Sequence, residues 1–241
     1  MFKLKFIIDF LLDILFPVKC LGCKKEGEWI CKSCLDRIEL LQVQTCPKCN
    51  KPSKNGKFCC CLGQNGSSNS ALSGIIIAAR YQDKLLQKAI HAFKYRFIRD
   101  LAVPLSHILI KILKKTLFQE EQKPHNIILI PVPLHKRKIL QRGFNQAELL
   151  AKEISKKFGM PLAKDKVIRT KNTKPQIELD PAARQTNVQD AFLCQKEIPK
   201  NKTIIIIDDV CTTSATLSEC AKAIRAKNPS KKIWGLVLAR G

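Results

Sequence analysis

The chain has 241 residues, enough for one large domain or two smaller ones, and 45% of them are hydrophobic, enough for a packed core. No apolar run reaches the roughly 20 residues that a bilayer-spanning helix needs, so we expect no transmembrane segment. The formal net charge of +23 predicts attraction to polyanions, such as nucleic acid, phosphorylated ligands or an anionic membrane surface. Most of this basic excess lies after residue 70.

The first 16 residues place apolar side chains at helical spacing, from Leu4 to Leu15. Asp9 and Asp13 interrupt the apolar run, and no small-residue cleavage site precedes Pro17, which argues against a secretory signal peptide. We therefore expect a short helix that packs on the following domain, with contact to a membrane surface as the alternative. We also expect a cytoplasmic, reducing location.

Nine of the twelve cysteines lie between Cys20 and Cys61, and in a reducing compartment such clustering indicates metal binding rather than disulfides. Each Cys-x-x-Cys knuckle presents two thiolates on one turn, and two knuckles complete a tetrahedral zinc site with four cysteine ligands. Three knuckles and a cysteine triplet predict two structural sites, although the spacing leaves a single ion and an interleaved pairing open. The first site would use Cys20, Cys23, Cys31 and Cys34. The second would use Cys46, Cys49 and two of the triplet Cys59, Cys60 and Cys61; we choose Cys59 and Cys61, because adjacent cysteines rarely chelate one ion well.

Residues 64–70 have the composition of a flexible linker. We therefore expect an N-terminal helix and zinc-ribbon domain in residues 1–70 and a second domain in residues 71–241. In the second domain, buried strands alternate with amphipathic helices, which predicts an α/β fold with a doubly wound, mainly parallel sheet. The expected strands are 75–79, 127–130, 167–169, 204–207 and 232–239, and the expected helices are 84–95, 101–117, 145–158 and 217–226.

Four consecutive isoleucines, 204–207, predict a strand buried on both faces, and Asp208 and Asp209 follow where this strand should end. Ligands of open α/β sheets bind beyond the carboxyl ends of the strands. Two adjacent carboxylates can accept hydrogen bonds from ribose hydroxyls, and a turn before a helix can bind a phosphate. We therefore expect a sugar-phosphate site, with an acidic helix cap as the alternative. The turn comprises Thr212, Thr213, Ser214, Ala215 and Thr216.

A group of cations follows the predicted strand 127–130, in what the sequence predicts to be a loop before the helix that starts near Asn145. Such a loop suits a pyrophosphate and its Mg²⁺, and an ordinary basic surface loop is the alternative. The four cations are Lys136, Arg137, Lys138 and Arg142. The polar segment 170–187 lacks periodicity and contains Lys174, Gln176 and Arg184, so it is a candidate lid.

The acidic segment resembles the phosphoribosyl-diphosphate (PRPP) signature of type I phosphoribosyltransferases, in which an apolar strand, two acidic residues and a Thr-Thr-Gly-Ala-Thr-like loop follow one another. Ser214 stands where that family usually has Gly. If the position needs a positive φ, serine is strained there. The resemblance implies that the turn binds the PRPP phosphate, and that a loop after an earlier strand binds the pyrophosphate.

Nearly the full chain resembles the ComF family. The resemblance implies a cytoplasmic competence protein that binds PRPP and handles incoming single-stranded DNA in natural transformation, with other DNA-uptake proteins at the inner membrane among its partners. The alternative is a phosphoribosyltransferase that acts on an unidentified acceptor, for which the sequence identifies no catalytic residue. The matching motifs are Cys20-x-x-Cys23, Pro131-Val132-Pro133, Arg142-Gly143-Phe144-Asn145-Gln146, Arg184 with Asn187-Val188, and Asp208-Asp209-Val210-x-Thr212-Thr213.

Overall fold

A computed structural model describes residues 17–59, 70–119, 124–173, 186–199, 201–229 and 232–241. The expected N-terminal helix and Cys61 lie outside these ranges. So does most of the candidate lid, including Lys174, Gln176 and Arg184. None of the helices within the described ranges is both long enough and apolar enough to cross a lipid bilayer.

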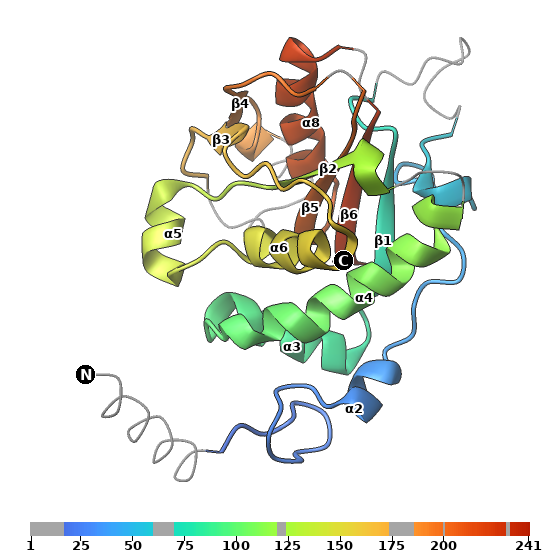
Figure 1. The fold of residues 1–241 in the computed structure, drawn as a ribbon, viewed down its shortest axis with the longest axis vertical. Helices are drawn as coiled ribbons and strands as arrows, with labels where there is room; N and C mark the ends of the chain where they lie inside the picture. Colours follow the sequence, from blue (N-terminus) through green and yellow to red (C-terminus); the bar gives the residue numbers. More distant parts are fainter. Residues whose placement is uncertain (1–16, 60–69, 120–123, 174–185, 200, 230–231) are drawn as a thin grey trace.

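Four parallel strands form the sheet at the centre of the molecule (Figure 1). They are β1 (Gly74–Arg80), β2 (Ile127–Pro131), β5 (Thr203–Cys211) and β6 (Ile233–Arg240), in the order β1-β6-β5-β2. Each pair of neighbours runs parallel, so all four carboxyl ends lie at the same edge of the sheet. This confirms the predicted α/β fold with a mainly parallel sheet.

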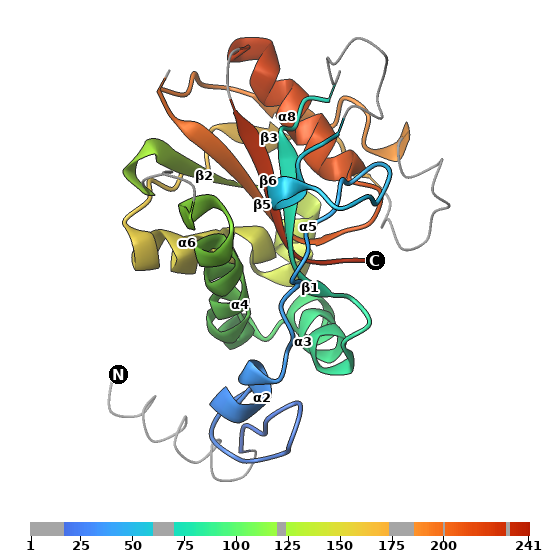
Figure 2. The ribbon, with the colours of Figure 1, turned by 90° about the vertical axis from the view of Figure 1, so that its right-hand side faces the viewer.

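Helices cover both faces of the sheet (Figure 2). Successive side chains of a strand point to opposite faces, and the isoleucines of β5 divide accordingly. Ile205 and Ile207 pack in one hydrophobic cluster with the helices α3 (Lys84–Tyr95), α4 (Ala102–Lys115) and α6 (Gln146–Phe158). Ile204 and Ile206 pack in a second cluster with α8 (Ala215–Lys227). All four isoleucines are fully buried, as the sequence predicted.

The strand β5 is longer than predicted. The expectation that it ends before the acidic pair is wrong, because β6 stays beside it as far as its last residues. Asp208 lies opposite Val237, and Cys211 lies opposite Arg240. The alternation of the strand therefore directs Asp208 and Asp209 to opposite faces of the sheet.

The smaller elements lie around this sheet. Strands β3 (Val167–Arg169) and β4 (Phe192–Cys194) form a separate antiparallel pair beside α8. The sequence predicted β3 but not β4. The short helix α2 (Lys32–Asp36) belongs to the cysteine-rich region, and single 3-10 turns occur at η1 (Lys54–Gly56), η3 (Arg99–Leu101), η4 (Leu117–Gln119) and η5 (Pro124–Asn126).

The predicted cation loop is a helix, α5 (Lys136–Arg142), so the expectation of a loop is wrong. The ring of His135 accepts a hydrogen bond from the backbone N–H of Arg137 at 3.3 Å and caps the start of the helix. Gly143 ends it with a φ of 75°, a left-handed conformation that favours glycine. Because no residue of α5 is buried, apolar periodicity could not reveal the helix.

Residues 40–58, called the edge segment below, run along the outer side of β1. Isolated antiparallel bridges join Leu40 to Ala79 and Lys57 to Gly74. The side-chain amide of Gln44, which is buried, donates to the carbonyl of Ile77 at 2.8 Å and accepts from its N–H at 3.0 Å. The cysteine-rich region thus covers the unpaired backbone groups of an edge strand.

We expect Gln44→Ala to lower the free energy of unfolding by about 2 kcal/mol, because it leaves a buried N–H and carbonyl of Ile77 without partners. Urea denaturation with zinc present measures the effect. Gln42→Ala is the matched control, since Gln42 is exposed and bonds only the nearby carbonyl of Leu40. Equal losses in the two variants would contradict the role given to Gln44.

Candidate functional site

The acidic pair lies near the carboxyl end of β5 and is joined to a helix by an ion pair. The Nζ atom of Lys94, in the last turn of α3, lies 2.8 Å from Oδ1 of Asp209. Asp209 is only 6% exposed, and the same oxygen accepts the N–H of Val210 at 2.6 Å. Burial opposes the charged form of Lys94, but the Asp209 carboxylate outweighs it, so the pKa of Lys94 is raised. The sequence analysis missed Lys94.

Asp208 lies in a different environment from its neighbour. Burial, and then the negative charge of Asp209, raises the pKa of Asp208 to about 7, although Lys94 and Arg169 act in the opposite direction. One carboxylate oxygen of Asp208 accepts the N–H of Asp209 at 2.9 Å. The site thus contains a carboxyl group that changes its charge near neutral pH.

Arg169, the last residue of β3, is a second site residue that the sequence analysis missed. Its guanidinium stacks over the ring of Phe192 on β4, 5.3 Å from the ring centroid, and donates to the hydroxyl of Thr173. Its Nε is buried and has no hydrogen-bond partner among the described residues. Because its charge also acts on Asp208, the β3–β4 pair presents a cation to the acidic pair.

The predicted phosphate turn follows β5, and α8 begins at Ala215. Ser214 has φ 60° and ψ 3°, so this position requires the left-handed conformation in which serine is strained. The hydroxyl of Thr213 is buried and has no hydrogen-bond partner in the part of the chain that the structure describes. The turn and the start of α8 border a cavity of about 470 Å³.

The structure brings only part of the predicted cation group towards the acidic pair. Arg142 stacks over the ring of Tyr95, the neighbour of Lys94, with 5.8 Å to the centroid, and its charge acts on Arg169. Lys136 and Arg137 are exposed on α5, and no hydrogen bond or ion pair among the described residues joins them to the acidic pair.

The segment Arg142–Gln146 holds the end of α3 in place. Phe144 is buried against Phe93, with 5.6 Å between the ring centroids. The amide of Asn145 donates to the carbonyl of Val132 at 2.9 Å, while its oxygen caps α6. Gln146, only 2% exposed, donates to the carbonyl of Phe93 at 3.5 Å and accepts from Arg142 at 3.3 Å. These contacts fix the helix end that carries Lys94.

The cysteines of the first two knuckles form one cluster in which the sulfur atoms all lie within 4.8 Å of one another: Cys20, Cys23, Cys31 and Cys34. Four thiolates around one zinc ion, at about 2.3 Å each, lie roughly 3.8 Å apart, so the set fits a tetrahedral site. The backbone N–H of Cys31 donates a hydrogen bond to the sulfur of Cys20 at 3.4 Å, an interaction that favours the thiolate form. A zinc ion bound by four protein thiolates has a structural role.

The second cluster brings together Cys46, Cys49 and Cys59, with 3.3 Å between the sulfur atoms of Cys49 and Cys59. The N–H of Cys59 points at the sulfur of Cys46, at 3.4 Å. This repeats the arrangement of the first cluster and fits three ligands of a second zinc ion. The expected fourth ligand, Cys61, lies outside the described residues.

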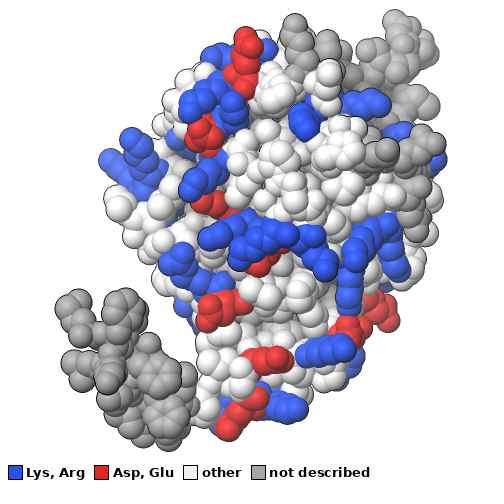
Figure 3. Space-filling model, viewed as in Figure 1, with Lys and Arg blue, Asp and Glu red and all other residues white. Residues whose placement is uncertain are grey.

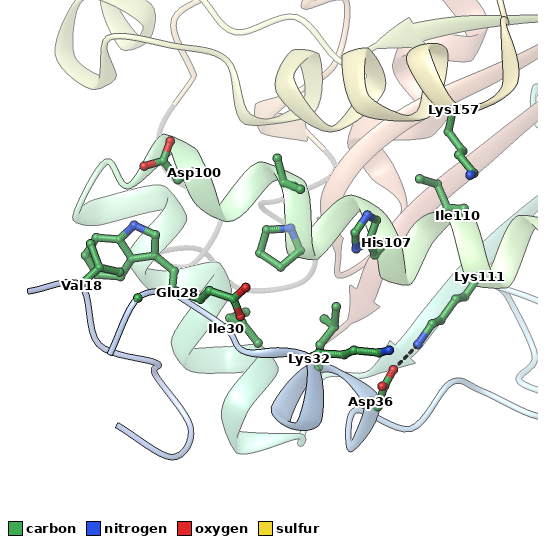
Figure 4. A pocket seen from close by; sticks show the side chains of 15 residues that line it. Val18, Glu28, Ile30, Lys32, Asp36, Asp100, His107, Ile110, Lys111 and Lys157 are labelled. Atoms are coloured by element: carbon green, nitrogen blue, oxygen red, sulfur yellow. Dashed lines mark hydrogen bonds and ion pairs between the residues drawn. The ribbon is translucent and has the colours of Figure 1, made fainter. Parts of the chain in front are cut away.

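A larger cavity, of about 710 Å³, lies between residues 18–36 and α4 (Figure 4). Its walls are mainly apolar, with contributions from Trp29, Ile30 and Val103. Lys111 of α4 and Asp36 form an ion pair of 2.6 Å at its side. The cavity contains neither the acidic pair nor the phosphate turn, so the predicted chemistry lies elsewhere.

Basic side chains extend over much of the molecular face in Figure 3, with acidic side chains between them. The whole chain has 43 lysine and arginine residues against 20 aspartate and glutamate residues. This distribution agrees with a surface that attracts polyanions over a wide area.

Comparisons with known proteins match both parts of the chain. Residues 11–62 match the double zinc ribbon domain, and residues 139–241 match the phosphoribosyl transferase domain. The chain is similar to the DNA utilization protein YhgH of Escherichia coli (strain K12), with 29% identity over 227 residues, which cover 91% of this chain and 96% of that protein.

Two proteins with competence names are also similar. Competence protein F of Haemophilus influenzae is 28% identical over 231 residues, covering 87% of this chain and 96% of that protein. Competence protein ComFC of Bacillus subtilis is 25% identical over 218 residues, covering 90% of this chain and 86% of that protein. The similarity therefore extends across both domains.

We expect Ser214→Gly to raise the free energy of unfolding by about 0.5 kcal/mol, because relief of the left-handed strain exceeds the added freedom of glycine in the unfolded chain. Differential scanning calorimetry measures the change. Ser214→Ala is the control: it keeps the strained Cβ and loses the hydroxyl that donates to the carbonyl of Thr213, so it should give no gain. Similar gains in both variants would contradict the strain.

The raised pKa of Asp208 predicts a pH-dependent stability. The folded protein holds this proton more tightly than the unfolded chain, so the contribution of Asp208 to stability falls as the pH rises from about 4 towards about 7. Asp208→Asn removes this loss. The stability of the variant relative to the unchanged protein should therefore increase by at least about 1 kcal/mol between pH 5 and pH 8, measured by urea denaturation.

Asp165→Asn is the matched control for this pH series. Asp165 is exposed, and the pKa of its carboxyl is lowered because Lys196 donates to it at 2.7 Å. Its replacement should not become more favourable as the pH rises. If the difference in unfolding free energy between Asp208→Asn and the unchanged protein is the same at pH 5 and at pH 8, the pKa of Asp208 is not raised.

Proposed function

We propose that the chain is a member of the ComF family that binds PRPP with Mg²⁺ and handles single-stranded DNA during DNA uptake in natural transformation. The observation that carries the proposal is the convergence of two carboxyl groups, three cations and a helix start at the carboxyl end of β5. This is the position at which open α/β sheets bind their ligands.

The ribose lies beside the acidic pair in this proposal. Asp208 is half-buried, and it accepts a hydrogen bond from one ribose hydroxyl once it is ionised. Oδ1 of Asp209 already bonds Lys94, so its other oxygen is the acceptor for a second hydroxyl. Lys94 keeps the charge of this buried carboxylate neutralised.

The two phosphate groups of PRPP take different parts of the site. The 5-phosphate binds the turn and the start of α8, where a helix N-terminus favours an anion: Thr212, Thr213, Ser214, Ala215 and Thr216. The pyrophosphate binds the cations of α5, namely Lys136, Arg137, Lys138 and Arg142, and Arg169 adds to them. When bound, Mg²⁺ neutralises the pyrophosphate oxygens.

The basic surface is proposed to bind the DNA backbone. The chain is 6% aromatic, which favours phosphate contacts over base stacking. The relatives named for DNA utilization or competence support a DNA-related role. In this proposal other DNA-uptake proteins at the inner membrane receive the DNA from this chain or deliver it.

The zinc ribbon has a structural role in this proposal. One ion is bound by Cys20, Cys23, Cys31 and Cys34, and the other by Cys46, Cys49, Cys59 and Cys61. The ten cysteines that the structure describes form no disulfide. We place the protein in the cytoplasm, where reduced thiols remain free to bind zinc.

The raised pKa of Asp208 favours a second candidate, a phosphoribosyltransferase. A carboxyl that titrates near neutral pH can accept the proton that an acceptor loses when it attacks C1 of the ribose. The bond from C1 to the pyrophosphate breaks as the bond to the acceptor forms, and the pyrophosphate leaves with its electron pair. The carboxylates would stabilise the positive charge that develops at C1.

The test is a pair of titrations of the zinc-loaded protein. Calorimetry measures PRPP binding with Mg²⁺, and fluorescence anisotropy measures single-stranded DNA binding at several salt concentrations with and without PRPP. We expect both ligands to bind, DNA affinity to fall steeply with salt, and PRPP to alter DNA affinity. Asp208→Asn should weaken PRPP binding at least tenfold and abolish the effect of PRPP on DNA, whereas Asp165→Asn should change neither.

Each outcome separates the candidates. Failure to bind PRPP would contradict the proposed ligand, and failure to bind DNA at physiological salt would contradict the DNA role. Release of pyrophosphate from PRPP in the presence of a nucleobase would establish the enzyme instead.

A further inference from the structure

The second cysteine cluster lies beside the phosphate turn. The cavity of about 470 Å³ at the start of α8 has walls from both parts of the chain. One wall comes from the knuckle between Cys46 and Cys49 and from residues close to it, namely Pro47, Lys48, Phe58, Ser70 and Ala71. The other comes from the turn and α8, namely Thr213, Ser214, Ala215, Ser218, Glu219 and Lys222.

An arginine at the end of β6 fixes the knuckle in this position. One guanidinium nitrogen of Arg240 donates to the carbonyl of Pro47 at 2.8 Å, and another donates to the side chain of Asn50 at 2.9 Å. Arg240 pairs in the sheet with Cys211, three residues before Ser214. The knuckle and the phosphate turn are therefore held by adjacent strand ends.

Two lysines line this cavity, and one of them has no ion-pair partner among the described residues. Lys222 is paired with Glu219 at 2.5 Å, and Glu219 also accepts the N–H of Asp190 at 3.1 Å. Lys48 is exposed, and its ammonium group forms no ion pair or hydrogen bond with a described residue. Its charge is therefore available to an anion in the cavity.

Two further features of the cavity suit a phosphate. The hydroxyl of Thr213 is buried without a partner among the described residues, although buried polar groups are normally hydrogen-bonded. The cavity is also bordered by the first residues of α8, a helix of 13 residues whose first N–H groups favour an anion. The acidic pair is not part of the lining, so the cavity would take the phosphate end of a ligand whose ribose lies at Asp208.

We propose that the zinc ribbon supplies part of the phosphate site: Lys48, held between two metal-binding cysteines, contacts the 5-phosphate of the bound ribose phosphate. This inference rests on the proposed PRPP function. It gives the ribbon a direct part in ligand binding, since the knuckle that would bind the second zinc ion also positions the lysine. It also explains why Arg240 fixes this knuckle to the strand beside β5.

The experiment measures the binding of three ligands by calorimetry: PRPP with Mg²⁺, ribose 5-phosphate, and inorganic pyrophosphate. Lys48→Glu should lower the affinity for PRPP and for ribose 5-phosphate at least tenfold, because both carry the 5-phosphate. Its effect on pyrophosphate should stay below twofold. Lys48→Met, which removes the charge without reversing it, should give a smaller loss in the same direction.

Lys51→Glu is the matched control, since Lys51 is exposed close to the same knuckle but does not line the cavity. It should leave all three affinities within twofold, which separates a local contact from a general change of charge. The zinc content of each variant is measured to show that the ribbon is intact.

The outcomes distinguish this inference from the function on which it rests. If the unchanged protein binds PRPP and the Lys48 and Lys51 variants behave alike, Lys48 does not contact the phosphate, and the proposed function stands. If Lys48→Glu leaves all three affinities unchanged and weakens only single-stranded DNA binding, measured by the same fluorescence anisotropy titration as above, the lysine belongs to the DNA surface and the inference is wrong. If the unchanged protein binds neither PRPP nor ribose 5-phosphate, both the function and the inference fail.

Discussion

The ion pair between Lys94 and Asp209 is the interaction on which the geometry of the site depends. A carboxylate that is 6% exposed is costly unless a cation pairs with it, and that cation comes from the end of α3. The end of α3 is in turn held by Phe144 and Gln146. The segment Arg142–Gln146 therefore acts largely through the backbone and core of α3, and within it only Arg142 directs a charge towards the site.

The two parts of the chain contact each other through several residues of the cysteine-rich region. The edge segment lies along β1, Gln44 bonds the backbone of Ile77, and Arg240 holds the second knuckle. Ribbon residues Leu35 and Ile38 also belong to the same hydrophobic cluster as α4. The described part of the ribbon is thus packed against the second part of the chain in two places, with residues around α2 against α4 and the edge segment along β1.

Sequence patterns predicted the structural features that depend on the local periodicity of apolar residues and on the spacing of cysteines. The strand at 204–207, the helix over Lys84–Tyr95 and the first cysteine cluster are all found. The positive φ at Ser214 also agrees with the glycine of the related motif. Lys94 and Arg169 could not be found in this way, because each is distant in sequence from the acidic pair and neither belongs to a motif. Only the packing of α3 and the β3–β4 pair brings their charges to β5.

The covering of β1 has a consequence for the protein without its metal. The edge segment contains Cys46 and Cys49 of the second cysteine cluster, so its attachment to β1 depends on the ribbon keeping its shape. β1 reads Gly-Ile-Ile-Ile-Ala-Ala-Arg, a short apolar segment with a single charge. Once uncovered, such a strand can pair with the same strand of another molecule and start the growth of intermolecular sheets. Bound zinc would then prevent aggregation through β1 as well as stabilise the fold.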